Sequence, residues 1–391
     1  MKEVWSYKLP YSDSNIVVDY ETPFIEYNGE ILFVSANRQK ISLIVLDSVT
    51  GEGEEYSLNN SVHILGKVSF LDSFCNGVII YTGDLFCYSN RTMTKIIELR
   101  QKGEVTSHII IDRFLYLVCV NGYNESKLIC INLDSFQIEW SLDISSKPYN
   151  SGPISYFEGK IVCFGRENLL FLDPVVGTVD KSIKISRVGK LFCPVRLNDE
   201  YIAMGYTNWS SAGIIKYNLI TNKAVWKSGR RFEGPLLQCM IYKKDNRLYW
   251  VKNFTELICI NEDSGEEVFV DRTYPWLYTD LFFKNDKIVF GTSGNGGFIN
   301  CVQDNSGSEE WQIPLGYGCM YFGNYENSII VSDIPNSKIL KIDIDKGNVI
   351  QTYNLQGAAV GRVIVFGHAF YTVVMNDENN TASLVKIDLD A

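Results

Sequence analysis

One short pattern recurs along the chain at a nearly constant interval. In each copy an apolar, strand-like run ends at a small polar residue; a few residues later, often just after a glycine, a second strand-like run begins. We call the polar residue the anchor. A period of about 40 to 50 residues is typical of propellers, solenoids and repeat arrays. Nine anchors follow one another at intervals of 40 to 45 residues: Asp47, Ser89, Asn132, Asp173, Asn218, Asn261, Gln303, Asp343 and Asp388.

The content of each period is typical of β-strands. Short runs rich in Ile, Val, Phe, Tyr and Leu, such as 160–164 and 168–172, alternate with Gly, Asn and Asp at turns. No stretch keeps the apolar spacing of a three-turn helix. We therefore predict an all-β chain that forms a single β-propeller domain over residues 1–391, with nine four-stranded blades. Eight blades result if the weak period around Ser89 is not a separate blade.

The two ends of the chain are complementary in pattern. The last period ends at Ala391, soon after the anchor Asp388, and is one strand short. The run from Val4 to Leu9, which contains Trp5, is similar to the fourth strands of other periods. We predict that this N-terminal strand pairs into the C-terminal blade and closes the ring, since tying down a terminus suppresses fraying. In three of those periods a tryptophan lies eight residues after the anchor: Trp140, Trp226 and Trp311.

The repeat carries a family resemblance. An apolar strand, a Leu-Asp-x-x-Thr-Gly turn as at 46–51 and a strand with a tryptophan resemble the PQQ-like repeat of the quinoprotein alcohol dehydrogenase-like β-propellers, over essentially the whole chain. The resemblance implies the propeller fold. For the quinone enzymes of that family it also implies an export signal, a disulfide between adjacent cysteines and a calcium site with an aspartate base. This sequence has no adjacent cysteines and no signal-like segment, so the quinone site is not matched and we expect no cofactor.

Composition excludes several kinds of partner. The chain has 46 Asp and Glu against 36 Lys and Arg, and it has no run of basic residues. Nucleic-acid binding needs clustered Lys and Arg, so we expect no nucleic-acid partner. No segment approaches the roughly 18 apolar residues that span a bilayer, so we expect no membrane insertion. The ten cysteines are scattered without a C-x-x-C pair, which favours reduced, buried thiols in a cytoplasmic protein.

Residues with catalytic potential are scarce. The three histidines, His63, His108 and His368, lie in distant periods, and no nucleophile, nucleotide or metalloprotease motif is present. Asp343 and Asp345 begin like a calcium loop, but the same residues are one copy of the repeated turn, and we interpret them as that turn. We therefore assign no catalytic, metal-binding or cofactor-binding residues, and we favour a protein without enzymatic activity.

Aromatic and arginine-rich connections are the candidate partner-binding segments. In a propeller of this connectivity, the connections between blades and those between second and third strands leave on one face, which is usually the recognition surface. Tryptophan, tyrosine and arginine anchor many interfaces because they bury much area at modest entropic cost. The alternative is that these side chains only fill space between blades. The candidates are Trp209, Arg230, Arg231, Tyr274, Trp276, Tyr278, Tyr317 and Tyr321.

Three functions stay open on the sequence. The first, which we favour, is a monomeric, non-catalytic scaffold that binds another protein through its loop face, for example as a cytosolic inhibitor or immunity-type partner. The second is a binder of small molecules or carbohydrates. The third is a lyase or hydrolase with acids at the channel mouth, which the scarcity of histidine disfavours.

Overall fold

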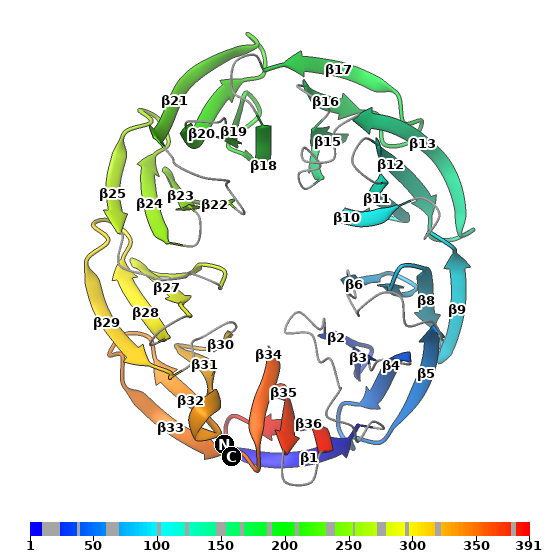
Figure 1. The fold of residues 1–391 in the computed structure, drawn as a ribbon, viewed down its shortest axis with the longest axis vertical. Coiled ribbons are helices and arrows are strands. Elements are labelled where there is room, and N and C mark those ends of the chain that lie inside the picture. The colour runs from blue at the N-terminus through cyan, green and yellow to red at the C-terminus, as the bar shows by residue number, and fades with distance from the viewer. Residues whose placement is uncertain are drawn as a thin grey trace. The chain divides into compact units, whose positions relative to one another are not determined.

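The fold was analysed in a computed structural model. It describes residues 1–9, 24–36, 40–59, 70–99, 103–121, 125–145, 154–164, 168–185, 190–207, 211–231, 239–252, 255–271, 279–293, 297–316, 322–376 and 381–391. These residues form nine four-stranded antiparallel sheets (Figure 1). The prediction of a β-propeller with nine blades is therefore confirmed. The residues around Ser89 form a blade of their own, which rules out the eight-blade alternative.

The chain divides into two compact units, of which unit 1 covers residues 1–94 and 274–391. It contains five blades, which are numbered in chain order, and the strands of each blade are given in order of hydrogen bonding. Blade 1 consists of β2 (Phe24–Tyr27), β3 (Glu30–Ala36), β4 (Ile41–Asp47) and β5 (Gly53–Asn59), and blade 2 of β6 (Phe70–Phe74), β7 (Gly77–Tyr81), β8 (Leu85–Ser89) and β9 (Thr92–Ile97). Blade 7 consists of β26 (Phe282–Lys284), β27 (Lys287–Gly291), β28 (Phe298–Gln303) and β29 (Glu309–Pro314), blade 8 of β30 (Phe322–Tyr325), β31 (Ser328–Asp333), β32 (Lys338–Asp343) and β33 (Val349–Asn354), and blade 9 of β34 (Ala358–Phe366), β35 (Ala369–Asn376), β36 (Thr381–Asp388) and β1 (Lys2–Lys8).

Unit 2 covers residues 95–273 and contains the other four blades. They are blade 3, β10 (Glu104–Ile111), β11 (Phe114–Asn121), β12 (Glu125–Asn132) and β13 (Gln137–Ser145); blade 4, β14 (Ser155–Phe157), β15 (Lys160–Phe164), β16 (Asn168–Leu172) and β17 (Val179–Lys184); blade 5, β18 (Lys190–Arg196), β19 (Tyr201–Thr207), β20 (Ser211–Asn218) and β21 (Lys223–Arg231); and blade 6, β22 (Cys239–Lys244), β23 (Arg247–Lys252), β24 (Glu256–Asn261) and β25 (Glu267–Asp271).

The N-terminal strand completes the C-terminal blade, as the sequence predicts. β1 pairs antiparallel with β36, with Lys2 opposite Asp388 and Lys8 opposite Ser383. Just beyond the strand, the Leu9 amide donates to the Ala382 carbonyl at 2.8 Å. Figure 1 shows β1 beside β36 in unit 1. The last blade therefore has four strands although the C-terminal segment supplies three.

Within each blade the strands differ in burial according to their position. Third strands such as β4 are buried on both faces, while fourth strands such as β29 and β33 alternate between exposed and half-buried residues. A third strand lies between two strands of its own sheet and contacts neighbouring blades on both faces, so an apolar run without alternation suits it. The fourth strand is an edge strand, which needs charged and polar side chains to discourage pairing with other chains.

The hydrophobic core consists of layers between successive blades. In unit 1 one layer joins blade 9 to blade 1 and includes Phe33, Leu46, Tyr371 and Leu384. In unit 2 a comparable layer joins blade 4 to blade 5 and includes Phe164 and Met204. Within each unit a sheet is covered by the next one, which is how a repeat that cannot bury its own faces becomes stable.

Helical structure is minimal. Among the described residues the one helical element is the short 3-10 turn η3 (Ile334–Asn336) between β31 and β32. None of the helices in this part of the chain has the length and apolar character to cross a bilayer.

Truncating Trp5 is expected to destabilise unit 1, because its half-buried ring packs in the layer between blades 9 and 1. Trp5→Ala should lower the free energy of unfolding by roughly 3 kcal/mol, within the range of large aromatic truncations. Val4→Ala is the matched control, since Val4 is 49% exposed on the same strand and should change stability by less than about 0.5 kcal/mol. Equal effects in urea denaturation would contradict a closing role for this strand.

Candidate functional site

The predicted partner-binding residues fall mostly outside the described part of the chain. Trp209, Tyr274, Trp276, Tyr278, Tyr317 and Tyr321 lie outside the described residues. The backbone of Arg230 and Arg231 is described, as the last two residues of β21. Their assignment as binding residues stays a prediction.

The strand register fixes the end of the sheet at which these two arginines lie. Arg231 is paired with Ser211 and Arg230 with Ala212, at the start of β20. Thr207, at the end of β19, is paired with Ala212 as well. The second-to-third-strand connection that contains Trp209 therefore starts and ends beside the arginines. We call this end of each blade the connection end, and the opposite end, which holds the anchor turns, the anchor end.

The anchor residues shape the turns at the anchor end. The Asp47 carboxylate accepts hydrogen bonds from the backbone N–H groups of Val49 and Thr50, at 2.9 and 2.7 Å. These bonds hold the pKa of Asp47 below its usual value. A short side chain with an acceptor oxygen is suited to this bond, which explains why Asp and Asn recur at this position. The same pair of bonds forms at Asn132, Asp173, Asn218, Asn261, Asp343 and Asp388.

The proposed structural role of the Asp343 turn agrees with this geometry. Asp343 accepts from the N–H groups of Asp345 and Lys346, both at 2.9 Å, as the other anchors do. Asp345 accepts instead from the Asn327 side chain at 2.8 Å. Across the described residues there is no group of three His, Cys, Asp or Glu side chains placed to hold a metal ion.

In six of the blades, the carbonyl directly after the anchor accepts side-chain hydrogen bonds from the preceding blade. We call it the junction carbonyl. At Ser48 it accepts from the Trp5 indole at 3.2 Å and from the Lys386 ammonium at 2.6 Å, both in blade 9. Side chains of the preceding blade also donate to the junction carbonyls of Pro174, Leu219, Glu262, Ile344 and Leu389.

A glycine makes room for the tryptophan at four of these junctions. Gly51 has a φ of +74°, and a Cβ there would lie 2.6 Å from the Trp5 ring. A side chain would therefore collide with the indole, and the left-handed backbone also disfavours one. Gly177, Gly265 and Gly347 contact Trp140, Trp226 and Trp311 in the same way.

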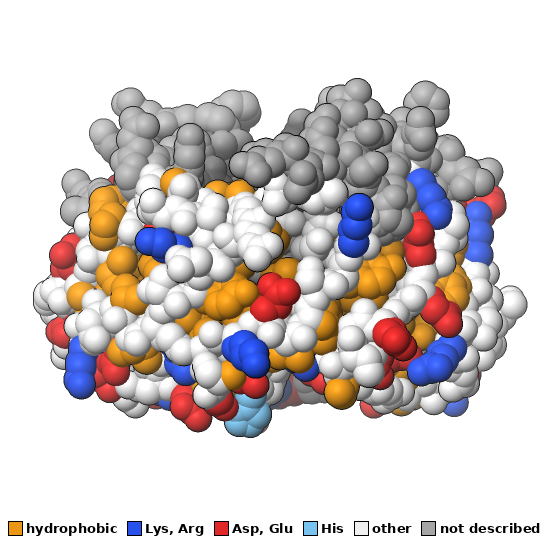
Figure 2. Space-filling model, turned by 90° about the horizontal axis from the view of Figure 1, so that it is seen from below, with side chains coloured by type: hydrophobic (Ala, Val, Ile, Leu, Met, Phe, Trp, Pro, Cys, Tyr) orange, Lys and Arg blue, Asp and Glu red, His pale blue; other side chains and the backbone are white. Residues whose placement is uncertain are grey.

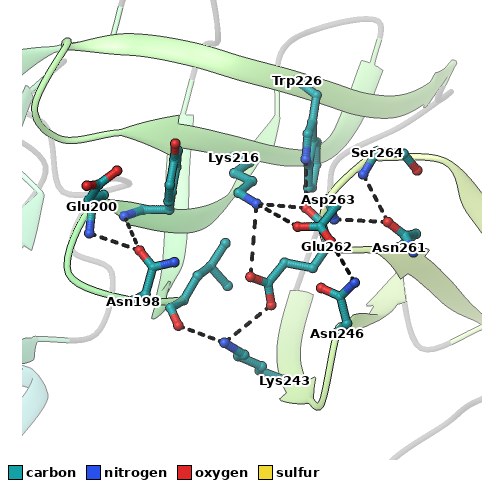
Figure 3. A network of polar contacts seen from close by, with 12 residues as sticks. Asn198, Glu200, Lys216, Trp226, Lys243, Asn246, Asn261, Glu262, Asp263 and Ser264 are labelled. Atoms are coloured by element: carbon teal, nitrogen blue, oxygen red, sulfur yellow. Dashed lines mark hydrogen bonds and ion pairs between the residues drawn. The ribbon is translucent and has the colours of Figure 1, made fainter.

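A buried ionic network reinforces the junction between blades 5 and 6 (Figure 3). The Lys216 ammonium donates to the Glu262 carbonyl at 3.1 Å and lies 4.0 Å from the Glu262 carboxylate, and both side chains are more than nine-tenths buried. Lys243 lies 3.3 Å from the other carboxylate oxygen and donates to the Leu197 carbonyl at 2.7 Å. A buried carboxylate costs much free energy unless it is paired, and here two ammonium groups flank it.

The junction between blades 1 and 2 departs from this plan. In blade 1 the residue two positions before the anchor is Val45. The equivalent positions of blades 5, 8 and 9 are occupied by Lys216, Lys341 and Lys386. Its cross-strand partner is Glu54, whereas Lys216 is opposite Trp226. On the blade 2 side, the residues Asn90 and Arg91, both with positive φ, make a tight turn in place of the anchor turn with glycine.

These substitutions leave a pocket of about 400 Å³ at the anchor end of unit 1. It is lined by one valine, one tyrosine, one arginine, four acids and the anchor-turn backbone, from Glu30, Val45, Asp47, Thr50, Glu52, Gly53, Glu54, Tyr88 and Arg91. Val45 and Tyr88 are buried, whereas Glu52 and Glu54 are exposed. The pocket therefore has a partly apolar floor and an acidic rim.

Two tyrosines hold acids of this pocket by hydrogen bonds. The Tyr88 hydroxyl donates to Glu30 at 2.9 Å, and the Tyr56 hydroxyl to Glu54 at 2.6 Å. Burial and the bond to Glu54 raise the pKa of Tyr56 to about 12, so this hydroxyl stays a donor. Arg91 lies 3.3 Å from Glu30. Within the described residues, no cation lies within ion-pair distance of Glu52 or Glu54.

A second polar cluster lies at the anchor end of blades 8 and 9. The Tyr325 hydroxyl donates to the Asp390 carboxylate at 2.8 Å, and His368 Nδ1 lies 2.8 Å from the same carboxylate. These bonds, that of Tyr325 first, hold the pKa of Asp390 below its usual value. The contacts join the segment after β36 to blade 8.

Seven cysteines have side chains that the structure describes, and all seven are free thiols. Six of them are buried, as expected for small apolar residues, but Cys75 is exposed, which differs from the sequence interpretation. Burial raises the pKa of Cys87 to about 11 and that of Cys163 to about 12. Such thiols are poor nucleophiles at neutral pH.

No family model matches the chain, and no curated protein matches it by sequence. Among solved structures, BamB from Moraxella catarrhalis is similar with a TM-score of 0.52 at 16% identity, covering 81% of this chain and 94% of that chain. The computationally designed Ika8 protein is similar with a TM-score of 0.53 at 12% identity, covering 99% of this chain and 100% of that chain. A europium-containing methanol dehydrogenase has a TM-score of 0.52 at 10% identity, with 96% and 84% covered.

At these identities the likeness shows the fold alone. BamB and the methanol dehydrogenase are PQQ-type β-propellers, so the resemblance seen in the sequence is confirmed at the level of the fold.

Sequence reasoning missed the junction lysines and the pocket. A lysine inside an otherwise apolar strand, as in Ile214-Ile-Lys216-Tyr, was a signal that could have found the buried network. The pocket had no comparable signal, because it depends on which residues meet across two blades.

We expect Gly51→Ala to destabilise unit 1 more than Gly29→Ala does. Both glycines lie in blade 1 with φ near +75°, at +74° and +79°, but a Cβ at Gly29 would meet nothing within 4 Å. Gly29→Ala should cost about 1 kcal/mol from backbone strain, and Gly51→Ala about 2 kcal/mol more from the collision with Trp5. Chemical denaturation of the two variants checks this, and equal losses would exclude tight contact at the junction.

The Asp47 turn should contribute to acid sensitivity. Because the folded pKa of Asp47 lies below its unfolded value of 3.8, its bonds stabilise the fold above that value and are lost as the pH falls through the folded pKa. Asp47→Asn keeps an acceptor oxygen, as Asn132 and Asn218 show, and cannot titrate. The variant should lose less stability than the wild type between about pH 5 and pH 2 in denaturation curves. If Asp47→Asn and the wild type lose the same stability as the pH falls, this assignment is contradicted.

Proposed function

We propose that the protein is a non-catalytic scaffold that binds another protein through the connection end of its blades. The observation that carries this proposal is the register of blade 5. It sets Arg230 and Arg231 directly beside the strand ends that flank the Trp209 connection. Arginine beside the ends of a connection whose sequence contains tryptophan supplies residue types that dominate interface energetics.

The structure of the opposite end, the anchor end, supports the same proposal. At the anchor end, hydrogen bonds from Trp5, Trp226 and Lys216 hold consecutive blades together. A framework fixed at one end lets the segments at the other end vary without loss of the fold. Figure 2 shows both acidic and basic side chains along the lower edge of the face it presents, rather than one broad basic surface.

We also propose that the protein acts as a monomer in the cytoplasm. Its seven described free thiols, six of them buried, support a reducing compartment, since secreted proteins commonly use cysteines in disulfides.

The test reverses charge at the connection end. Tagged protein, used to retain partners from an extract of the cells that produce it, should recover one protein at equimolar ratio. Arg230→Glu combined with Arg231→Glu should weaken this complex at least about tenfold, which is 1.4 kcal/mol. Lys223→Glu is the matched control because Lys223 begins the same strand and is opposite Asn218 at the anchor end.

The outcomes separate the alternatives. A partner lost with the double variant and kept with Lys223→Glu supports the proposal. Recovery of no equimolar protein, or of a small molecule or carbohydrate alone, would overturn it, as would equal loss with both variants.

A further inference from the structure

The repeat itself indicates which chemical group fits the pocket between blades 1 and 2. Four other junctions receive a lysine ammonium from the preceding blade at the junction carbonyl: Lys181, Lys216, Lys341 and Lys386. An ammonium beside the anchor turn of the following blade thus recurs at four of the described junctions. In blade 1 the corresponding cross-strand pair is Val45 and Glu54, which supplies no cation and adds a carboxylate.

The pocket has the shape and charge for an external ammonium on an alkyl chain. Its volume is about 400 Å³, and Val45 and Tyr88, which are 5% and 1% exposed, form the apolar part of its lining. Glu52 and Glu54 stand at its rim, and no described cation pairs with them. Arg91 lies 3.3 Å from Glu30 and, after the hydrogen bonds from the turn backbone, also lowers the pKa of Asp47, so the acids of the pocket without a described basic partner are Glu52 and Glu54. The net charge of −10 further favours approach of a cation.

We infer that this pocket binds a lysine side chain presented by a partner protein. The alkyl stem lies over Val45 and Tyr88, and the ammonium donates to the carboxylates of Glu52 and Glu54. The extended apolar stem matches the way lysine buries its methylene groups while its charged end stays near water. The site lies at the anchor end and so does not depend on the connection-end proposal.

The first arm of the test measures binding of a defined probe to the whole protein. Nα-acetyl-L-lysine methylamide is titrated at low ionic strength, where screening is weak, and the amide signals of Val45, Thr50 and Gly53 are followed by NMR. The expected result is saturable shifts at these residues. The isosteric norleucine derivative, which lacks the ammonium, should produce none.

The second arm uses two kinds of variant: one removes the negative charges of the pocket, and the other fills the pocket with a lysine of the protein itself. Glu52→Gln with Glu54→Gln should weaken probe binding about tenfold, which is 1.4 kcal/mol, while Glu309→Gln, an exposed acid on β29, should leave it within about twofold. Val45→Lys installs the lysine that blades 5, 8 and 9 carry at this position, so it should fold, occupy the pocket with its own ammonium and abolish probe binding. An unchanged circular dichroism spectrum and an undiminished melting temperature establish that the variant is folded.

Several results would overturn the inference. Absence of saturable binding by the lysine derivative would do so, and so would equal binding to Val45→Lys and the wild type. Tighter binding of 1,5-diaminopentane with none of the lysine derivative would show a free-diamine site and overturn the assignment to a protein side chain. Because none of these readouts uses the connection end, they are independent of whether the scaffold proposal holds.

Discussion

The junction carbonyl is the polar group that six of the described junctions between successive blades share. The anchor side chain fixes its own turn by accepting two backbone N–H groups, and the next carbonyl then faces the preceding blade. There it accepts from an indole, an ammonium or a phenol, as at Ser48, Glu262 and Pro174. A carbonyl left unpaired between blades would cost about 1 to 3 kcal/mol, so each junction has a reason to supply a donor. The tryptophan and the glycine that receives it follow from this requirement.

The donors vary from one junction to the next while the acceptor stays the same. Blade 9 supplies both Trp5 and Lys386, blade 3 supplies Trp140 with Tyr116, and blade 4 supplies Lys181 alone. A backbone acceptor makes this exchange possible, because a carbonyl accepts from any donor of suitable reach. Selection can therefore change junction side chains without changing the fold, and the pocket between blades 1 and 2 shows how far one junction departs from the others.

This arrangement concentrates the described bonds between blades at one end of the sheets. The anchor end contains the hydrogen bonds to the junction carbonyls, and the buried ion pairs around Glu262 lie at one of these junctions. The connection end of blade 5 includes Arg230 and Arg231, the last residues of β21. In a blade of four antiparallel strands, the connections between blades and those between second and third strands start and end at the same end of the sheet. A binding surface formed by them needs no additional structural element.

The sequence alone predicted nine blades with eight as the alternative, the four-stranded repeat and the completion of the last blade by β1. These features arise from local patterns, since apolar runs, turn residues and a fixed period act within about 43 residues of chain. The tertiary structure decided the rest of the candidate sites. Lys216 and Lys386 occupy equivalent positions in the sequence. Only the packing shows that Lys216 lies beside a buried carboxylate, whereas Lys386 donates to the carbonyl that also accepts from the Trp5 indole. The pocket beside Val45 arises from the pairing of Val45 with Glu54 and from the short turn of another blade, and such contacts between distant segments leave no mark in a periodic pattern.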